Sequence, residues 1–192
     1  MRTTGTAATT TGMETRRLVA DYINFRLQKQ GLRWSTCPEL PAVPTNVERA
    51  MRLLGEEFET RYTEVFQEMC NQLHITPNNA QPTFVAIVNE LFSDGIKWGR
   101  IVALFSFGGA LAVQCVEKEM PVLVDNVVEW VANYVDSNLQ SWIQENGGWV
   151  RTILLLLLYS SCIFCLSCAF GYSAVGCKNN RYWSASLSLD AR

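Results

Sequence analysis

The fold is decided by a charge-free stretch, IVALFSFGGALAVQCV, which runs from Ile101 to Val116. Apolar or small residues cover every face of the helix that it predicts, and such a helix either crosses a membrane or lies at the centre of a core. Its sixteen residues would span about 24 Å, less than the ~30 Å hydrocarbon core of a bilayer. Gly108 and Gly109 also favour close packing by neighbouring helices. We therefore expect a central core helix, although the stretch is apolar enough to enter a membrane if the domain opens.

Amphipathic helices are predicted on both sides of this stretch, because apolar residues recur there at helical spacing. Thr45 or Asn46 would cap the second helix, and Asp136 or Ser137 would begin the last one, which ends at Gly147. The sequence shows neither repeats nor strand-like alternation, so we expect an all-α bundle around a central helix. The predicted helices cover residues 14–30, 46–61, 63–73, 81–92, 98–116, 121–135 and 137–146.

The composition divides the chain into a globular part and a hydrophobic tail. The 192 residues suit one domain, and 48% of them are hydrophobic, which excludes a long disordered acidic chain. The net charge of −2 argues against a generally basic surface, so we expect no nucleic-acid partner. Only 18% of residues are charged, and residues 152–177 contain no charge at all. We assign 14–150 to the helical domain and 1–13 to a disordered, Thr-rich N-terminus without the apolar core of a signal peptide.

The tail, residues 151–177, has the length and composition of a membrane-spanning helix. Arg151 precedes the uncharged stretch, and Lys178 and Arg181 follow it. The predicted arrangement is a transmembrane anchor followed by a short C-terminal tail, residues 178–192, with the domain left in the cytosol. A buried core helix or a hydrophobic tail without function is the alternative.

Residues that could carry catalysis are not arranged into a recognisable site. Cys162, Cys165 and Cys168 have the CxxCxxC spacing of some iron–sulfur proteins, but they lie in the lipid-like tail. Small residues in a helix, or acylated cysteines, explain them better. The remaining cysteines suggest no disulfide framework, and His74 has no evident partner. We therefore expect neither an enzyme nor a metal or other cofactor.

Arg100 is the most informative charged residue. It lies in the first turn of the central helix, where the helix dipole disfavours a cation, so a carboxylate should offset it. That carboxylate could come from a partner protein, with bidentate geometry. An internal ion pair, for example with Glu90 or Glu56, is the alternative, and residue type alone does not decide between an internal and an external carboxylate.

The second predicted helix carries apolar residues along one face, with a small residue among them. Such a face either packs on the core, the more common case, or inserts into the groove of a partner. A small residue there would let another helix approach closely. The face comprises Val47, Met51, Leu54, Gly55 and Phe58, with Glu56 next to the glycine.

Four segments together resemble the homology motifs of the Bcl-2 family, in the family's order and over about residues 14–150. NELFSDGIKWGRIVALFSFGGAL, residues 89–111, resembles the first motif, and SWIQENGGW, residues 141–149, resembles the second. AMRLLGEEFETRY, residues 50–62, resembles the third, called BH3, and RRLVADYINFRLQKQG, residues 16–31, resembles the fourth. The chain is most similar to the pro-survival branch that includes Bcl-w and Bcl-x.

The resemblance implies a helical bundle around a central hydrophobic hairpin, with a surface groove for the BH3 helices of pro-apoptotic relatives. Arg100 would pair with the partner's Asp, and Gly99 would let the partner helix approach. The tail would anchor the chain in the mitochondrial outer membrane or the endoplasmic reticulum. The other residues implied to line the groove are Phe58, Tyr62, Phe66, Leu91, Lys97, Val102, Ala103 and Phe107.

Three positions depart from the family's pattern. Lys97 stands where Asn is frequent, and its charge would favour acidic ligands. Glu56 replaces the usual Asp of the third motif, which argues against an exposed killer motif. After Trp149 the chain runs almost directly into the leucines of the tail, so we expect one end of the groove to be incomplete.

The function that the resemblance implies is pro-survival: sequestration of BH3 helices, with homo- or heterodimers of family members as a further expectation. The alternative is a pro-apoptotic effector of the same fold, which opens membranes through its central hairpin.

Overall fold

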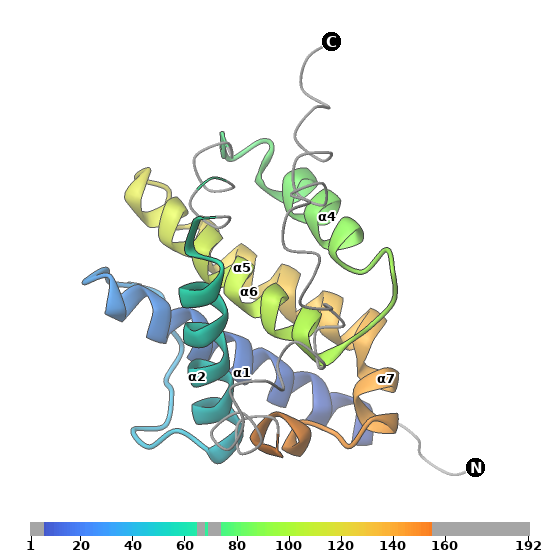
Figure 1. Ribbon diagram of the computed structural model, residues 1–192. Coiled ribbons are helices and arrows are strands. Elements are labelled where there is room, and N and C mark those ends of the chain that lie inside the picture. The colour runs from blue at the N-terminus through green and yellow to red at the C-terminus, as the bar shows by residue number, and fades with distance from the viewer. Residues whose placement is uncertain (1–5, 65–67, 69–73, 155–192) are drawn as a thin grey trace.

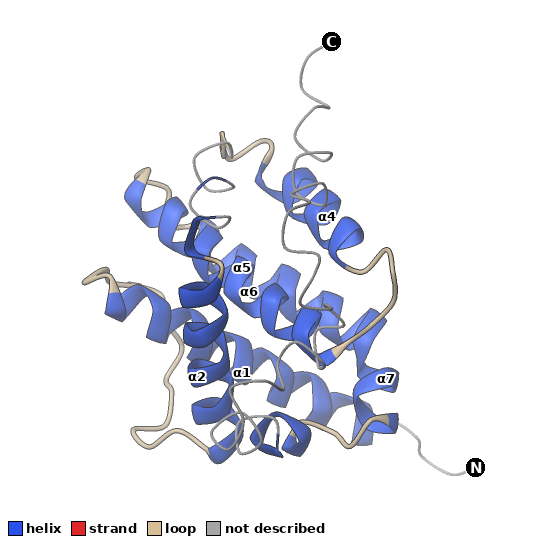
Figure 2. Ribbon diagram, in the orientation of Figure 1, coloured by secondary structure: helices blue, strands red, loops and turns tan. Residues whose placement is uncertain are grey.

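The computed structural model describes residues 6–64, 68 and 74–154, and all regular structure within them is helical (Figure 2). The all-α prediction is therefore confirmed for this part of the chain. The helices are α1 (Thr6–Lys29), α2 (Asn46–Arg61), α4 (Ala80–Leu91), α5 (Trp98–Glu117), α6 (Leu123–Tyr134) and α7 (Gln140–Glu145), with a π-helical segment (Val135–Leu139) between the last two.

The central helix of the bundle is α5, as the charge-free stretch predicts. Helices α1, α2, α4 and α6 all pack against it (Figure 1). Among the described helices, α5 alone is long and apolar enough to span a bilayer, yet 83% of its apolar window is buried. Ile101 and Leu104 are completely buried. The helix is apolar on every face because neighbours surround it, as in any core helix.

The N-terminus of α2 is set by Thr45, one of the two predicted caps. The Glu48 backbone N–H donates to Thr45 Oγ1 over 3.2 Å, and the Thr45 N–H donates to Glu48 Oε2 over 2.6 Å. This reciprocal pair is a capping box, which satisfies two backbone donors at the helix start. Glu48 is 2% exposed and also pairs with Arg17 of α1 at 3.1 Å. The cap thus ties α2 to α1 as well.

Helix α1 begins at Thr6, whereas residues 1–13 were expected to be disordered. For residues 6–13 this expectation is wrong; residues 1–5 lie outside the described part of the chain. A helix that is already held by packed residues extends at little cost, because nucleation is the unfavourable step. Leu18, Tyr22 and Leu27 supply that packing, since each is buried.

The predicted break at Asp136 or Ser137 is also wrong. The chain stays helical through the π segment Val135–Leu139 and continues into α7. A π turn accommodates an extra residue and so shifts the buried face of the helix. Val135 and Leu139 are 0% and 1% exposed, so this shift keeps both in the core.

Two predicted segments fall mostly or wholly outside the described residues. The helix expected at 63–73 is described only at its start and at residue 68. The tail is described as far as residue 154, where residues 150–154 are helical. The predicted membrane anchor is therefore not tested by this structure.

Candidate functional site

The candidate site is built around the start of α5, where Arg100 is held by the preceding turn. Its Nη1 donates to the Gly95 carbonyl oxygen over 2.6 Å, and its Nη2 pairs with Asp94 Oδ2 over 3.2 Å. The Arg100 side chain is 22% exposed and that of Asp94 57% exposed. The internal alternative therefore exists in this structure, with Asp94 as the carboxylate in place of Glu90 or Glu56, the two examples named for it. Glu56 instead accepts from Lys29 over 2.5 Å.

Lys97 and Gly99, two further predicted groove residues, lie beside Arg100 at the start of α5. Lys97 is exposed in extended conformation at the N-cap, and its side chain makes no capping hydrogen bond. Gly99 is buried. The first turn of α5 also contains no acidic residue, so the positive helix end and two cations lie close together. This end of α5 would favour a negatively charged group.

The predicted groove residues divide into a buried set and a half-buried set. Val102, Ala103 and Phe107 of α5 are 2%, 4% and 1% exposed, so they lie inside the bundle. Phe107 stacks on Phe84 of α4 with ring centroids 5.9 Å apart. The half-buried set is Phe58, Tyr62 and Leu91, whereas Phe66 lies outside the described residues.

Helix α2 turns its BH3-like face toward the core, the more common of the two alternatives. Met51 and Leu54 are 0% and 3% exposed, and Val47 is partly buried against the same core. Phe58 follows on this face, and its ring lies 4.8 Å from that of Tyr62. In the described structure this face is thus buried in the bundle at Met51 and Leu54 and only partly buried at Phe58.

Aromatic residues join the first and second sequence motifs at the start of α5. The Trp98 ring centroid lies 5.6 Å from that of Trp142 and 6.2 Å from that of Trp149. Phe105, two turns along α5, meets Trp149 edge-on at 6.0 Å. These contacts fix the beginning of α5, and therefore Arg100, against the C-terminal end of the described bundle.

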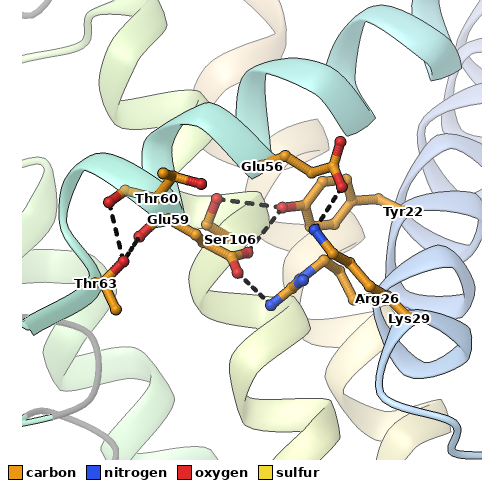
Figure 3. A network of polar contacts seen from close by, with 8 residues as sticks. All are labelled: Tyr22, Arg26, Lys29, Glu56, Glu59, Thr60, Thr63 and Ser106. Atoms are coloured by element: carbon orange, nitrogen blue, oxygen red, sulfur yellow. Dashed lines mark hydrogen bonds and ion pairs between the residues drawn. The ribbon is translucent and has the colours of Figure 1, made fainter.

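A buried polar network joins α1, α2 and α5 (Figure 3). The Tyr22 hydroxyl donates to Glu59 Oε1 over 3.2 Å and lies 3.2 Å from Ser106 Oγ. Arg26 forms an ion pair with the same Glu59 carboxylate, and their side chains are only 9% and 16% exposed. Sequence reasoning missed this network. The available signal was the spacing of Tyr22 and Arg26, which puts a cation on the apolar face of helix one.

Burial changes the titration of two groups in this network. Loss of water raises the pKa of the Tyr22 hydroxyl, and the nearby Glu59 carboxylate raises it further. Burial also raises the pKa of Glu59, although the Arg26 guanidinium opposes this rise. The loss of hydration is therefore a larger effect on Glu59 than the attraction of its partner.

A separate pocket of about 310 Å³ lies between α1, the loop after it and the start of α6. Trp34 in its wall donates to Asp125 Oδ1 over 3.2 Å. Arg16, Glu39 and Leu40 also line it. None of the predicted groove residues does, so this pocket is distinct from the candidate site.

The described residues contain no cluster of His, Cys, Asp or Glu able to hold a metal ion.

Comparisons with known proteins match the site-bearing part of the chain. Residues 51–149 match the family model described as "Apoptosis regulator proteins, Bcl-2 family". Rat and human Bcl-2-like protein 1 are each 56% identical to this chain over 103 residues, which are 54% of this chain and 44% of theirs. Chicken apoptosis regulator Bcl-2 is 33% identical over an alignment 217 positions long, which covers 79% of this chain and 93% of the relative. The chain thus spans about half the length of the Bcl-2-like protein 1 relatives that it matches.

Proposed function

Because the chain belongs to the Bcl-2 family of apoptosis regulators, we propose that it is a pro-survival member that sequesters the BH3 helices of pro-apoptotic relatives. The observation that carries this proposal is the state of Arg100, whose guanidinium is held in place by a partner that another carboxylate can replace. The apolar residues of α2, α4 and α5 would receive the anchors of the bound helix.

The ion pair of Arg100 is suited to exchange. Asp94 is more than half exposed, and exposed ion pairs contribute only ~0–1 kcal/mol. A BH3 aspartate that approached beside the buried Gly99 would meet Arg100 with less water around it, where a charge-assisted hydrogen bond is stronger. Exchange of one carboxylate for the other would then favour the complex.

The apolar part of the groove would open when the ligand enters. Val102 and Phe107 are buried, so a BH3 helix must displace or part the groups that cover them. The ligand therefore selects or induces a more open state, and its affinity includes the free energy of that opening. Phe58 and Tyr62, which are already half-buried, would form the rim.

Titration of a fluorescent BH3 peptide tests the assignment of Arg100. Removal of one member of a buried charge pair typically costs ~2–5 kcal/mol, so Arg100→Ala should weaken binding by at least ~30-fold. Arg16→Ala is the matched control, because Arg16 forms an exposed pair with Glu129 between α1 and α6, and its affinity should equal that of the wild type. Equal affinities of Arg100→Ala and the wild type would contradict the role of Arg100.

Asp94→Asn tests the exchange itself. If Asp94 competes with the ligand's carboxylate, its neutralisation should leave peptide binding at least as tight as in the wild type. Markedly weaker binding by Asp94→Asn would show that Asp94 supports the ligand-binding position of Arg100, which contradicts a replaceable partner.

Liposome assays separate sequestration from the effector alternative. Inhibition of dye release by another family effector supports the pro-survival proposal. Dye release by this chain itself, alone or with a BH3 peptide, supports a membrane-opening effector in which the apolar α5 leaves the core.

We further propose that residues 151–177 anchor the chain in the mitochondrial outer membrane or the endoplasmic reticulum. The support is the uncharged stretch between Arg151 and Lys178, long enough to cross a bilayer. Cell fractionation of the full chain and of a chain ending at Trp149 tests this. Equal membrane retention of the two would defeat the proposal.

A further inference from the structure

We propose that Arg26 and Glu59 are positioning residues for the groove: their buried pair locks α2 against α1 and α5, and thereby orients the groove-lining residues of α2. This inference rests on the proposed function. It concerns a pair of residues that joins α1 to α2 and includes none of the predicted groove residues, so it adds to the roles of Arg100 and the apolar lining.

The side chains of Tyr22 and Arg26 in α1 fit between α2 and α5 because each of these two helices has a glycine where it crosses α1. An added Cβ on Gly55 of α2 would lie 2.1 Å from Tyr22 Oη. An added Cβ on Gly109 of α5 would lie 2.9 Å from Arg26 Cγ and 3.2 Å from Tyr22 Cε1. Any other residue at these two glycines would force the Tyr22 or Arg26 side chain to shift, so the crossing is built for these two side chains.

The network links α2 to both α1 and α5 close to Glu59. Glu59 of α2 receives the Arg26 guanidinium and the Tyr22 hydroxyl from α1. Tyr22 also lies 3.2 Å from Ser106 Oγ of α5. Figure 3 shows these side chains converging in the space between the three helices. A rotation of α2 about its axis would pull Glu59 away from both α1 partners.

The same rotation would move the proposed groove rim. Glu59 directly follows Phe58 in α2. Tyr62 is the C-cap residue, and its backbone N–H donates to the Phe58 carbonyl oxygen, so the three residues move with the end of the helix as one body. The Phe58 and Tyr62 rings lie 4.8 Å apart. The Arg26–Glu59 pair therefore determines the angle at which this aromatic pair faces a ligand.

Loss of one member of the pair has a larger effect than loss of both. Without Arg26, the Glu59 carboxylate is left in a site with little water, and the chain can relieve this only if α2 moves to hydrate it. With Glu59 also neutralised, the reason for that movement disappears. The difference in binding between the single and the double variant therefore distinguishes a positioning role of the pair from a contribution to general packing.

The experiment compares variants by titration of a fluorescent BH3 peptide, at a temperature where circular dichroism shows every variant folded. Arg26→Met should weaken binding at least fivefold, and Arg26→Met with Glu59→Gln should return to within twofold of the wild type. Arg16→Met, on the same helix with an exposed ion pair to Glu129, should also remain within twofold.

Glu59→Gln alone is the second variant, and it keeps the experiment decisive if Arg26→Met fails to fold. Glutamine retains the side-chain length and an oxygen that accepts from Tyr22, so this variant should stay folded at the assay temperature. Because the buried Arg26 guanidinium is left without its carboxylate, peptide affinity should fall two- to fivefold. A packing role alone would not lower the affinity of a variant that remains folded.

The remaining outcomes overturn the proposal. Wild-type peptide affinity in Arg26→Met contradicts the positioning role. Where that variant does not fold, wild-type affinity in Glu59→Gln contradicts it instead. A double variant that binds the peptide as weakly as Arg26→Met also contradicts it. If Arg100→Ala abolishes binding while the Arg26 and Glu59 variants bind as tightly as the wild type, this inference alone is overturned. Absence of binding by the wild type overturns the groove function, and the inference with it.

Discussion

At the scale of single residues, Tyr22 combines the demands of an apolar core and a polar network. Its ring is completely buried and meets Phe105 edge-on at a centroid distance of 5.8 Å. Its hydroxyl must then find partners within the protein, because an unsatisfied buried hydroxyl costs ~1–3 kcal/mol. Glu59 and Ser106 supply them. The missing side chain of Gly55 provides the space for this hydroxyl.

Gly55→Ala should destabilise the protein. A Cβ at 2.1 Å from Tyr22 Oη requires displacement of a ring that is fixed on all sides. Overpacking of this kind costs ~1–3 kcal/mol, against a gain of ~1 kcal/mol for alanine in a helix, so we expect a net loss of up to ~2 kcal/mol. Gly108→Ala is the matched comparison, because its Cβ would meet only a Val131 methyl group at 2.9 Å. Chemical denaturation should rank Gly55→Ala as clearly the less stable; the reverse order would contradict the model of the crossing.

Glu59 should make the free energy of unfolding depend on pH in an unusual direction. Burial raises its pKa above the ordinary 4.5, Glu56 adds to the rise, and Arg26, Tyr22 and Lys29 oppose it. The folded state then holds the proton more tightly than the unfolded chain. Its contribution to stability is complete below pH 4.5 and is lost as the pH rises through the folded-state pKa.

Urea denaturation between about pH 4 and pH 7 measures this effect against Glu59→Gln, which cannot titrate. The free energy of unfolding of the wild type, minus that of the variant, should fall as the pH rises. A difference that stays constant or grows with pH would show that the ion pair with Arg26 outweighs the loss of hydration.

At the scale of helices, charged pairs hold α2 in register on α1. The Asp21 carboxylate of α1 accepts hydrogen bonds from both Nε and Nη2 of Arg52, over 2.9 and 2.5 Å. The Arg52 guanidinium also lies 5.0 Å from the Phe25 ring centroid. Asp21 is only 4% exposed. Together with the pairs at Glu48 and Glu59, this contact specifies the position of α2 more sharply than its apolar face alone would.

The capping box gives a prediction for the start of α2. Thr45→Ala removes the acceptor for the Glu48 backbone N–H and should reduce stability by ~0.5–2 kcal/mol. Thr60→Ala is the control, because Thr60 is exposed in the same helix, where alanine is slightly favourable. Thermal unfolding should show a lower midpoint for Thr45→Ala only. Equal midpoints for the two variants would mean that the cap contributes nothing measurable.

At the scale of the whole molecule, the bundle depends on α5 as a shared core. Phe105 is 1% exposed and lies against Tyr22 of α1 and Trp149 near the end of the described chain. One side chain therefore joins the first helix, the central helix and the second sequence motif. Damage at this position should affect the stability of the bundle as a unit.

Phe105→Ala should lower the free energy of unfolding by ~3–5 kcal/mol, through lost burial and the cavity that remains. Val122→Ala serves as the control, since Val122 is 77% exposed and surface changes usually stay within ~0.5 kcal/mol. Guanidinium denaturation followed by tryptophan fluorescence measures both. A loss below ~1 kcal/mol for Phe105→Ala would contradict the central position of this ring.

Much of the helical layout was predictable because it depends on local chemistry. The bounds of α2 match residues 46–61, α4 differs from its predicted range by one residue at each end, and α5 differs by one residue at its C-terminal end. The start of α1 and the continuity from α6 to α7 were not predictable, because the packing of neighbouring helices overrides weak local signals there. In the candidate site, Arg100 was identified from its unfavourable place at a helix start, but its partner Asp94 was not, since a turn brings the two together.

The amino-acid sequence by itself determined that this protein is all-helical around an apolar core helix, because hydrophobic periodicity and the charge-free stretch of α5 do not depend on distant contacts. Only the tertiary structure decided that Tyr22 and Arg26 enter the crossing at Gly55 and Gly109 to meet Glu59. That arrangement joins residues 33 to 87 positions apart, and the free energy of burying a charge depends on what surrounds it in space. Sequence spacing carries no record of those surroundings.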